Sequence, residues 1–208
     1  MKKIRVKLTF IESVLGTAPN NSEIYSEYIA SNAPDAKTME EEIEAIGVDG
    51  VTEKGITVFP RTEDGKPFIY DYQIKGFFKD ACSMLSRVGG KDESGKKKKV
   101  NESSKLSAYK KVIDGLIFVQ PRKIPFEFDG EITLCQRPLR AQTMQGERIC
   151  LASSEEIPAG ASIEFDVICL SDEHMAAVLE WLDYGVLRGI GQWRNAGRGA
   201  FTYEIIGD

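Results

Sequence analysis

Residues 185–201 read Gly-Val-Leu-Arg-Gly-Ile-Gly-Gln-Trp-Arg-Asn-Ala-Gly-Arg-Gly-Ala-Phe. Glycine tolerates positive φ angles and lets another chain approach the backbone closely. Arginine donates paired hydrogen bonds to phosphate, and tryptophan offers a ring on which a base can stack. The segment therefore predicts a loop that holds a phosphodiester chain. A tight helix-to-strand connection, whose glycines serve packing alone, is the alternative interpretation.

The nucleic-acid contacts predicted in this glycine-rich loop are Arg188, Gly189, Gly191, Trp193, Arg194, Gly197, Arg198 and Gly199. The loop lacks the third glycine of a dinucleotide fingerprint, and the Gly-Lys-Ser/Thr of a Walker loop is absent. The loop also follows a predicted helix and precedes a predicted strand, whereas a dinucleotide fold needs the order strand, loop, helix. The sequence therefore excludes both nucleotide-binding motifs.

On the N-terminal and C-terminal sides of this loop, hydrophobic periodicity predicts the core elements. Apolar residues at helical spacing predict helices over 71–88 and 172–187. Alternating apolar residues predict strands over 3–10 and 161–170, and a last strand covers 200–206. Without insertions the order is βαββαβ, which predicts an α+β, ferredoxin-like (RRM-like) antiparallel sheet with both helices on one face. We expect one domain, residues 1–208.

Additional strands are predicted between the two helices. Asp64-Gly65 lies between apolar runs at 56–59 and 67–70, and Asp129-Gly130 lies between runs at 124–128 and 131–135. An Asp-Gly pair between two apolar runs is typical of a β-hairpin, so two extra hairpins are expected. The apolar run 112–119 is interpreted as a further strand.

Two segments interrupt this pattern with opposite charge. Residues 20–50 predict an acidic helical insertion, with short helices over 22–30 and 38–46; between Glu23 and Asp49 the local charge is −7. Residues 89–105 lack periodicity and predict a flexible, lysine-rich loop. Its basic run consists of Lys96, Lys97, Lys98 and Lys99. Such a run suits contact with a polyanion, although a merely solvated loop is the equal alternative.

Composition bounds the function further. The chain has 208 residues, a formal net charge of −5 and 42% hydrophobic residues, which is ordinary for a globular protein. No apolar run is long enough for a transmembrane helix, and no signal peptide is recognised, so a cytoplasmic location without membrane contact is expected. The four cysteines form no Cys-x-x-Cys pair, which favours free buried thiols, and we expect no metal and no cofactor.

Three stretches of this sequence resemble the RAMP superfamily, the ferredoxin-like subunits of CRISPR–Cas effector complexes. Residues 189–201 are similar to the family's glycine-rich loop before the last strand. Residues 67–76, Pro-Phe-Ile-Tyr-Asp-Tyr-Gln-Ile-Lys-Gly, align without gaps to the family's Pro-x-Ile-Pro-Gly-Ser-Ser-Leu-Lys-Gly. The first strand and the following Leu15-Gly16-Thr17 are similar to the family's first strand and glycine turn.

The resemblance implies RNA binding, in many members along a protein filament, and it places Lys75 and Gly76 near the RNA backbone. In this chain Asp71, Tyr72 and Gln73 stand where the family has Gly-Ser-Ser. The implied partners are single-stranded RNA or DNA, a CRISPR effector subunit, or further copies of the chain. The sequence is also similar to phage and prophage proteins of unassigned function.

Three functional hypotheses follow. The first is a non-catalytic binder of single-stranded nucleic acid that uses the glycine-rich loop, the lysine run, and Trp193 or Tyr72 for stacking. The second is a phage anti-defence protein that imitates or blocks a CRISPR subunit or captures a nucleotide, with segment 23–49 facing a partner. The third is a ribonuclease whose general base would be His174, the single histidine. We expect no catalytic residue and no enzyme activity.

Overall fold

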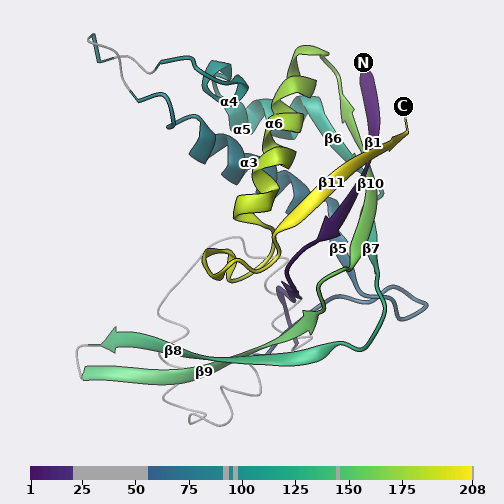
Figure 1. Ribbon diagram of the computed structural model, residues 1–208, viewed down its shortest axis with the longest axis vertical. Coiled ribbons are helices and arrows are strands. Elements are labelled where there is room, and N and C mark those ends of the chain that lie inside the picture. Colours follow the sequence, from purple (N-terminus) through teal and green to yellow (C-terminus); the bar gives the residue numbers. More distant parts are fainter. Residues whose placement is uncertain (21–55, 91–93, 96–97, 144–145, 208) are drawn as a thin grey trace.

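The computed structural model describes residues 1–20, 56–90, 94–95, 98–143 and 146–207. Figure 1 shows its helices and strands. In chain order they are β1 (Lys2–Phe10), β2 (Val14–Leu15), β3 (Ala18–Pro19), β4 (Thr57–Val58), β5 (Phe68–Tyr70), α3 (Asp71–Leu85), α4 (Glu102–Lys105), α5 (Tyr109–Leu116), β6 (Ile117–Gln120), β7 (Lys123–Glu127), β8 (Thr133–Thr143), β9 (Gly146–Ile157), β10 (Ser162–Cys169), α6 (Glu173–Arg188), the 3₁₀ turn η1 (Arg194–Ala196) and β11 (Phe201–Gly207). The predicted helices 22–30 and 38–46 lie outside the described residues.

The main sheet has the strand order β11-β1-β10-β7-β5, and β6 also pairs with β10. Its strands are antiparallel, and β1 lies between β10 and β11. With α3 after the first strands and α6 between β10 and β11, this is the predicted ferredoxin-like fold. The fold class is therefore confirmed.

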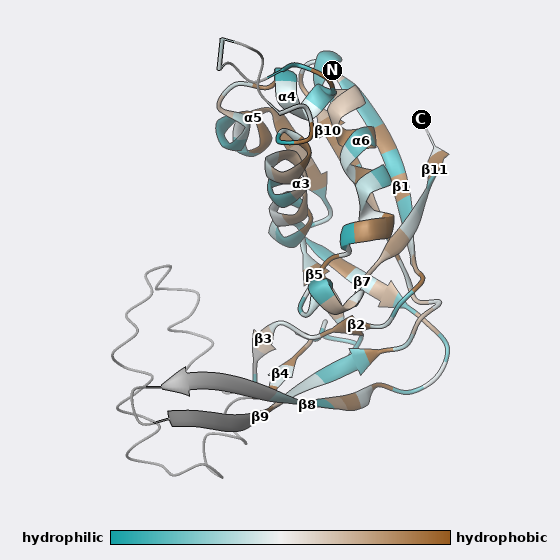
Figure 2. Ribbon diagram, turned by 60° about the vertical axis from the view of Figure 1, so that its left-hand side comes forward, coloured by the Kyte–Doolittle hydropathy of each residue, from teal (hydrophilic) through white to brown (hydrophobic). Residues whose placement is uncertain are grey.

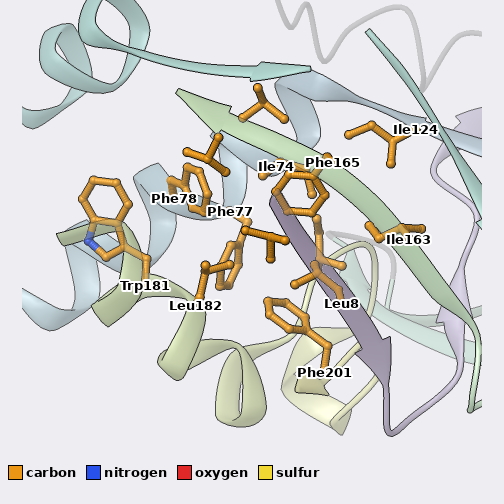
Figure 3. Packing of buried hydrophobic residues seen from close by; sticks show 14 of the residues in the cluster. Leu8, Ile74, Phe77, Phe78, Ile124, Ile163, Phe165, Trp181, Leu182 and Phe201 are labelled. Atoms are coloured by element: carbon orange, nitrogen blue, oxygen red, sulfur yellow. The ribbon is translucent and has the colours of Figure 1, made fainter. Parts of the chain in front are cut away.

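One face of this sheet forms the hydrophobic core. Alternate residues of β1 are buried, and alternate residues of β10 lie directly opposite them; the paired residues are Ile4 with Val167, Val6 with Phe165, and Leu8 with Ile163. Side chains of α3 and α6 pack onto this face together, as Figure 3 shows for Phe77, Phe78, Trp181 and Leu182. Both helices therefore cover the same face, as the two apolar stripes predicted. No helix among the described residues covers the other face, which is called the open face below.

A second sheet contains β2, β9, β4, β3 and β8, and its longest part is the β8–β9 ribbon. The ribbon projects from the body of the molecule in both views (Figures 1 and 2). Here the hairpin predicted around Asp129-Gly130 is wrong, because β7 pairs with β10 and β5 whereas β8 pairs with β9. Gly130 has a positive φ, but its turn carries the chain from one sheet to the other.

The hairpin predicted around Asp64-Gly65 forms only beside its turn, where Arg61 pairs with Pro67 and the amide of Phe68 donates to the carbonyl of Pro60. The turn itself forms, because the amide of Thr62 donates to the carbonyl of Lys66 and Gly65 has a φ of 82°. The flanking strands then diverge, since β4 joins the second sheet and β5 joins the main sheet. The local turn therefore forms as predicted, while the pairing of β4 and β5 depends on residues distant in the sequence.

Two further boundaries differ from the prediction. The expected strand 112–119 is helix α5 up to Leu116 and strand β6 only from Ile117. Ile113 and Ile117 are both buried, and their spacing of four fits one helical face as well as a strand. The end of the expected loop 89–105 is helix α4, held by the buried Ser103. The flexibility of the remaining loop and the division into insertions stay predictions.

Ser103 anchors α4 through a small polar cluster on α6. Its amide and its hydroxyl both donate to Glu180 Oε2, at 2.8 and 2.6 Å. The buried indole of Trp181 donates from Nε1 to Ser103 Oγ at 2.9 Å. The Ser103 hydroxyl thus makes a hydrogen bond to both the Glu180 carboxylate and the Trp181 indole, which gives these two groups a partner in place of water.

We expect Ser103→Ala to lower the free energy of unfolding by about 2 kcal/mol, because the Trp181 N–H loses its acceptor inside the core. Urea unfolding followed by tryptophan fluorescence measures this change. Ser104→Ala is the control, because Ser104 is half-buried and caps the same short helix through its hydrogen bond to Asn101. If Ser103→Ala lowers the free energy of unfolding no more than Ser104→Ala does, the Glu180–Trp181 cluster adds no stability beyond the helix cap.

No helix among the described residues is long and apolar enough to cross a membrane.

Candidate nucleic-acid interface

The three stretches that carry the family resemblance meet at one place in the fold. The side-chain amide of Gln73, in the first turn of α3, donates to Thr17 Oγ1 at 2.7 Å. Gly191 lies against the carbonyl oxygen of Leu15, and the amide of Gly199 donates to the carbonyl of Ser13 at 2.9 Å. The turn after β1, the start of α3 and the glycine-rich loop therefore form one continuous surface.

The glycine-rich loop folds back on itself. The amide of Ile190 donates to the carbonyl of Gly199 at 2.9 Å, and Ile190 is buried. Gly189 and Gly199 both have positive φ angles, and a Cβ on either would overlap the facing backbone. These two glycines are therefore required by the loop's own packing, whereas Gly197, at a φ of 84°, has open space around it.

The three predicted arginines of the loop form ion pairs within the protein. Arg188 Nε and Arg194 Nη1 each lie 2.8 Å from the same oxygen of Asp80 on α3. Arg198 lies 2.6 Å from Glu156 on β9 and also donates to Ser13. These contacts fasten the loop to the main sheet's helical layer on one side and to the second sheet on the other.

Asp80 is the counter-charge of the loop on α3. Burial raises its pKa, but the hydrogen bond from Arg188 and the charge of Arg194 outweigh this, so the pKa lies below its ordinary value of 3.8. Because the folded-state pKa is lowered, the stabilisation by this carboxylate is present at neutral pH and is lost only as the pH falls through the lowered pKa.

Arg137 is a residue of this site that the sequence analysis did not select. It comes from β8, is only 7% exposed, and has its guanidinium 4.6 Å from the centre of the Trp193 ring. Its Nη2 donates to Gln192 at 2.8 Å, and its Nη1 contacts Ser154 at 3.4 Å. Its Nε has no hydrogen-bond partner, and no carboxylate pairs with Arg137 in the described part of the chain. Arg137 is therefore a buried cation with no counter-ion among the described residues.

The remaining predicted contacts do not all join this surface. Gly76 is exposed and lies one helical turn before Asp80, on the same side of α3 as this partner of Arg188 and Arg194. Lys75 lies on the other flank, where its Nζ contacts the carbonyl of Asp114 at 3.3 Å. Lys98 and Lys99 are exposed, and the amide of Lys98 donates to the carbonyl of Gly90, which lies beyond the C-terminal end of α3. Lys96 and Lys97 lie outside the described residues.

His174 lies at the first turn of α6, and the glycine-rich loop follows the last turn of the same helix. A helix of this length separates them by roughly 20 Å, so His174 does not contribute to the loop surface. Among the cysteines, Cys82 and Cys169 are free and buried, as predicted, and burial raises the pKa of each thiol to about 11. Cys135 is free and partly exposed.

The sequence matches no family model and no curated protein. Among solved structures, a chain of the Type III-B Cmr-beta complex bound to cognate target RNA is similar over 99% of this chain, with a TM-score of 0.52 at 12% identity. The two chains share a fold. This protein spans 61% of the length of that Cmr-beta chain. A chain of a Type IV-B CRISPR complex matches with a TM-score of 0.47 at 14% identity, over 98% of this chain and 90% of that one.

Proposed function

We propose that the protein is a non-catalytic, RAMP-type binder of single-stranded RNA whose glycine-rich loop holds the phosphate backbone. The observation that carries this proposal is the convergence of three segments, distant in sequence, on one surface around the loop. The shared fold with a chain of an RNA-bound CRISPR complex agrees with it. Partnership with CRISPR subunits or self-association into a filament belongs to the same proposal.

The charge of the loop surface supports binding of a polyanion. Four arginines lie there, Arg137, Arg188, Arg194 and Arg198, and among the described residues their ion-pair partners are the two carboxylates of Asp80 and Glu156. A phosphate entering the surface meets this excess of positive charge even though the whole chain carries a net charge of −5. The intramolecular ion pairs hold the guanidinium groups in place, so their ordering cost is already met before RNA arrives.

Arg137 of β8 and Trp193 of the glycine-rich loop form the second part of the proposed binding surface. A buried cation without a counter-ion is unfavourable, and an approaching phosphate would relieve that cost. Trp193 covers Arg137 with one face of its ring and is 39% exposed. Its outer face is available for a base, which makes phosphate binding and stacking adjacent functions of one loop.

We expect Arg194→Ala and Arg198→Ala each to weaken binding of single-stranded RNA by about 1 kcal/mol at every sequence and to flatten the salt dependence. The effect is modest because each arginine already pairs with a carboxylate, with which the phosphate must compete. Fluorescence anisotropy with labelled RNA at several salt concentrations measures it.

Lys66→Ala is the control for these variants. Lys66 also pairs with a glutamate, Glu127, at 2.8 Å, but it lies in the turn before β5, and β5 is at the other end of the strand order from β11. Equal affinity of all three variants and the parent would place the RNA elsewhere.

Purification without nuclease, followed by absorbance at 260 and 280 nm, tests whether nucleic acid accompanies the protein at all.

A protein-facing, anti-defence role is the second candidate. The acidic segment 23–49 favours it, since a run of carboxylates can occupy a basic groove of a nucleic-acid-binding partner. A parent protein that binds no nucleic acid at low salt would favour this role, and reversal of Glu40, Glu41 and Glu44 would then be tested for loss of a partner.

A further inference from the structure

The hydrogen-bonded pairing along strand β10 of the main sheet is interrupted at one place. Strand β10 pairs with β6 at residues 166–169 and with β7 at residues 162–163. Between these two ladders the chain leaves the sheet at Pro121 and Arg122. The result is a hollow of about 560 Å³ beside β6. Strands β1 and β10 separate β6 from the edge strand β11, which follows the glycine-rich loop.

The walls of this hollow combine aromatic rings with hydrogen-bonding groups. Phe118 and Gln120 point to the open face, because their neighbours Ile117 and Val119 are buried in the core. Phe118 is 39% exposed. Asp166, which lies opposite Gln120 in the register, and Asp71 from the first turn of α3 complete the lining.

A second aromatic surface borders the hollow at Arg122. The guanidinium of Arg122 lies 5.6 and 5.5 Å from the ring centres of Tyr70 and Tyr72, which are stacked on each other 5.1 Å apart. The same guanidinium lies 2.7 Å from Asp71. Tyr72 is 48% exposed. The rim therefore presents stacked, planar groups that are held in place by an ion pair.

The charges in the hollow decide what it suits. Asp71 is paired with Arg122, and Asp166 lies 2.9 Å from Lys3, so the lining is close to neutral but still offers carboxylate and amide acceptors. A phosphate would meet two carboxylates and is disfavoured. A nucleobase has a flat π face for Phe118 and ring or exocyclic N–H groups for the acceptors.

We infer that this hollow is a nucleobase-binding site. This deepens the proposed function, because the base would belong to the bound single strand. Lys75, whose Nζ lies 4.9 Å from the centre of the Phe118 ring, then stands at the base site rather than at the glycine-rich loop. The hollow would hold a base of a nucleotide other than those whose phosphates the loop contacts.

The experiment combines oligonucleotide affinity with direct observation of the base. We expect Phe118→Ala to weaken binding of single-stranded RNA roughly five- to tenfold without changing the salt dependence, because stacking releases no counter-ions. Phe118→Trp, which keeps an aromatic face, should retain the affinity. Ile205→Ala is the matched control, since it also truncates a partly exposed apolar side chain (46% exposed), on the opposite edge strand.

Ligand-observed NMR with the common nucleoside 5′-monophosphates separates this inference from the proposed function. We expect saturation transfer to base protons in the parent and its loss in Phe118→Ala. If RNA binds but Phe118→Ala changes neither its affinity nor the saturation transfer, the base site is disproved and the loop proposal stands. If RNA does not bind but transfer depends on Phe118, the base site stands and the loop proposal fails.

Discussion

Gly199→Ala should destabilise the protein by about 3 kcal/mol or more, because the loop cannot close around an added methyl group. Gly199 has a φ of 71°, and a Cβ there would overlap the carbonyl oxygen of Ile190. The hydrogen bond between the amide of Ile190 and the carbonyl of Gly199 would be lost with it. Chemical denaturation measures the loss of stability.

Gly197→Ala separates this overlap from the cost of the backbone angle. Gly197 also has a positive φ, of 84°, but a Cβ there meets no atom within 4 Å. We therefore expect it to cost only about 1 kcal/mol. RNA affinity should fall by about tenfold or more in Gly199→Ala, since both Arg194 and Arg198 move with the loop, and little in Gly197→Ala. Equal effects of the two variants would contradict the packing argument.

The sequence was sufficient for the elements whose pattern is local. Alternation along residues 3–10 and 161–170 predicted two central strands with the correct buried faces, because each strand has one face on the core. Helical spacing predicted α3 and α6 for the same reason. The ferredoxin-like order of these elements then followed from their sequence along the chain.

The second sheet was not predictable in this way. Residues 133–136 of β8 are exposed or half-buried on both faces, so they carry no clean alternation, and Pro138 lies inside the strand. The chain bends at Asp129-Gly130, but whether the flanking strands pair with each other is decided by β9, which is distant in the sequence.

The candidate site shows the same division. The glycines and arginines of the loop were visible as a composition, but their ion pairs with Asp80 and Glu156 required the folded chain. Arg137 could not be found from the sequence, because its importance rests on burial under Trp193 and on the absence of a carboxylate beside it in the described residues. A single arginine in a polar stretch of sequence indicates neither its burial nor the charges around it.

Arg137→Met should move stability and binding in opposite directions. Methionine fills the space beneath Trp193 without a charge, so the free energy of unfolding should stay equal or rise by about 1 kcal/mol, as expected when a costly buried ion is replaced by an apolar side chain. Affinity for single-stranded RNA should fall by about 2 kcal/mol, roughly thirtyfold, because the proposed phosphate contact loses a cation that no described carboxylate neutralises. Denaturation and anisotropy titrations on the same samples measure both quantities.

Arg61→Met is the control for the change in net charge. Arg61 precedes the turn at Gly65 and lies 2.6 Å from Glu155 of β9, so its charge is already compensated. Its loss should alter RNA affinity by about twofold at most, a surface-charge effect screened by salt. If Arg137→Met destabilises the fold and leaves RNA affinity unchanged, the buried guanidinium is a structural hydrogen-bond donor to Gln192 and Ser154. If instead the buried guanidinium binds an anionic ligand, Arg137→Met must give a stable protein that no longer binds RNA.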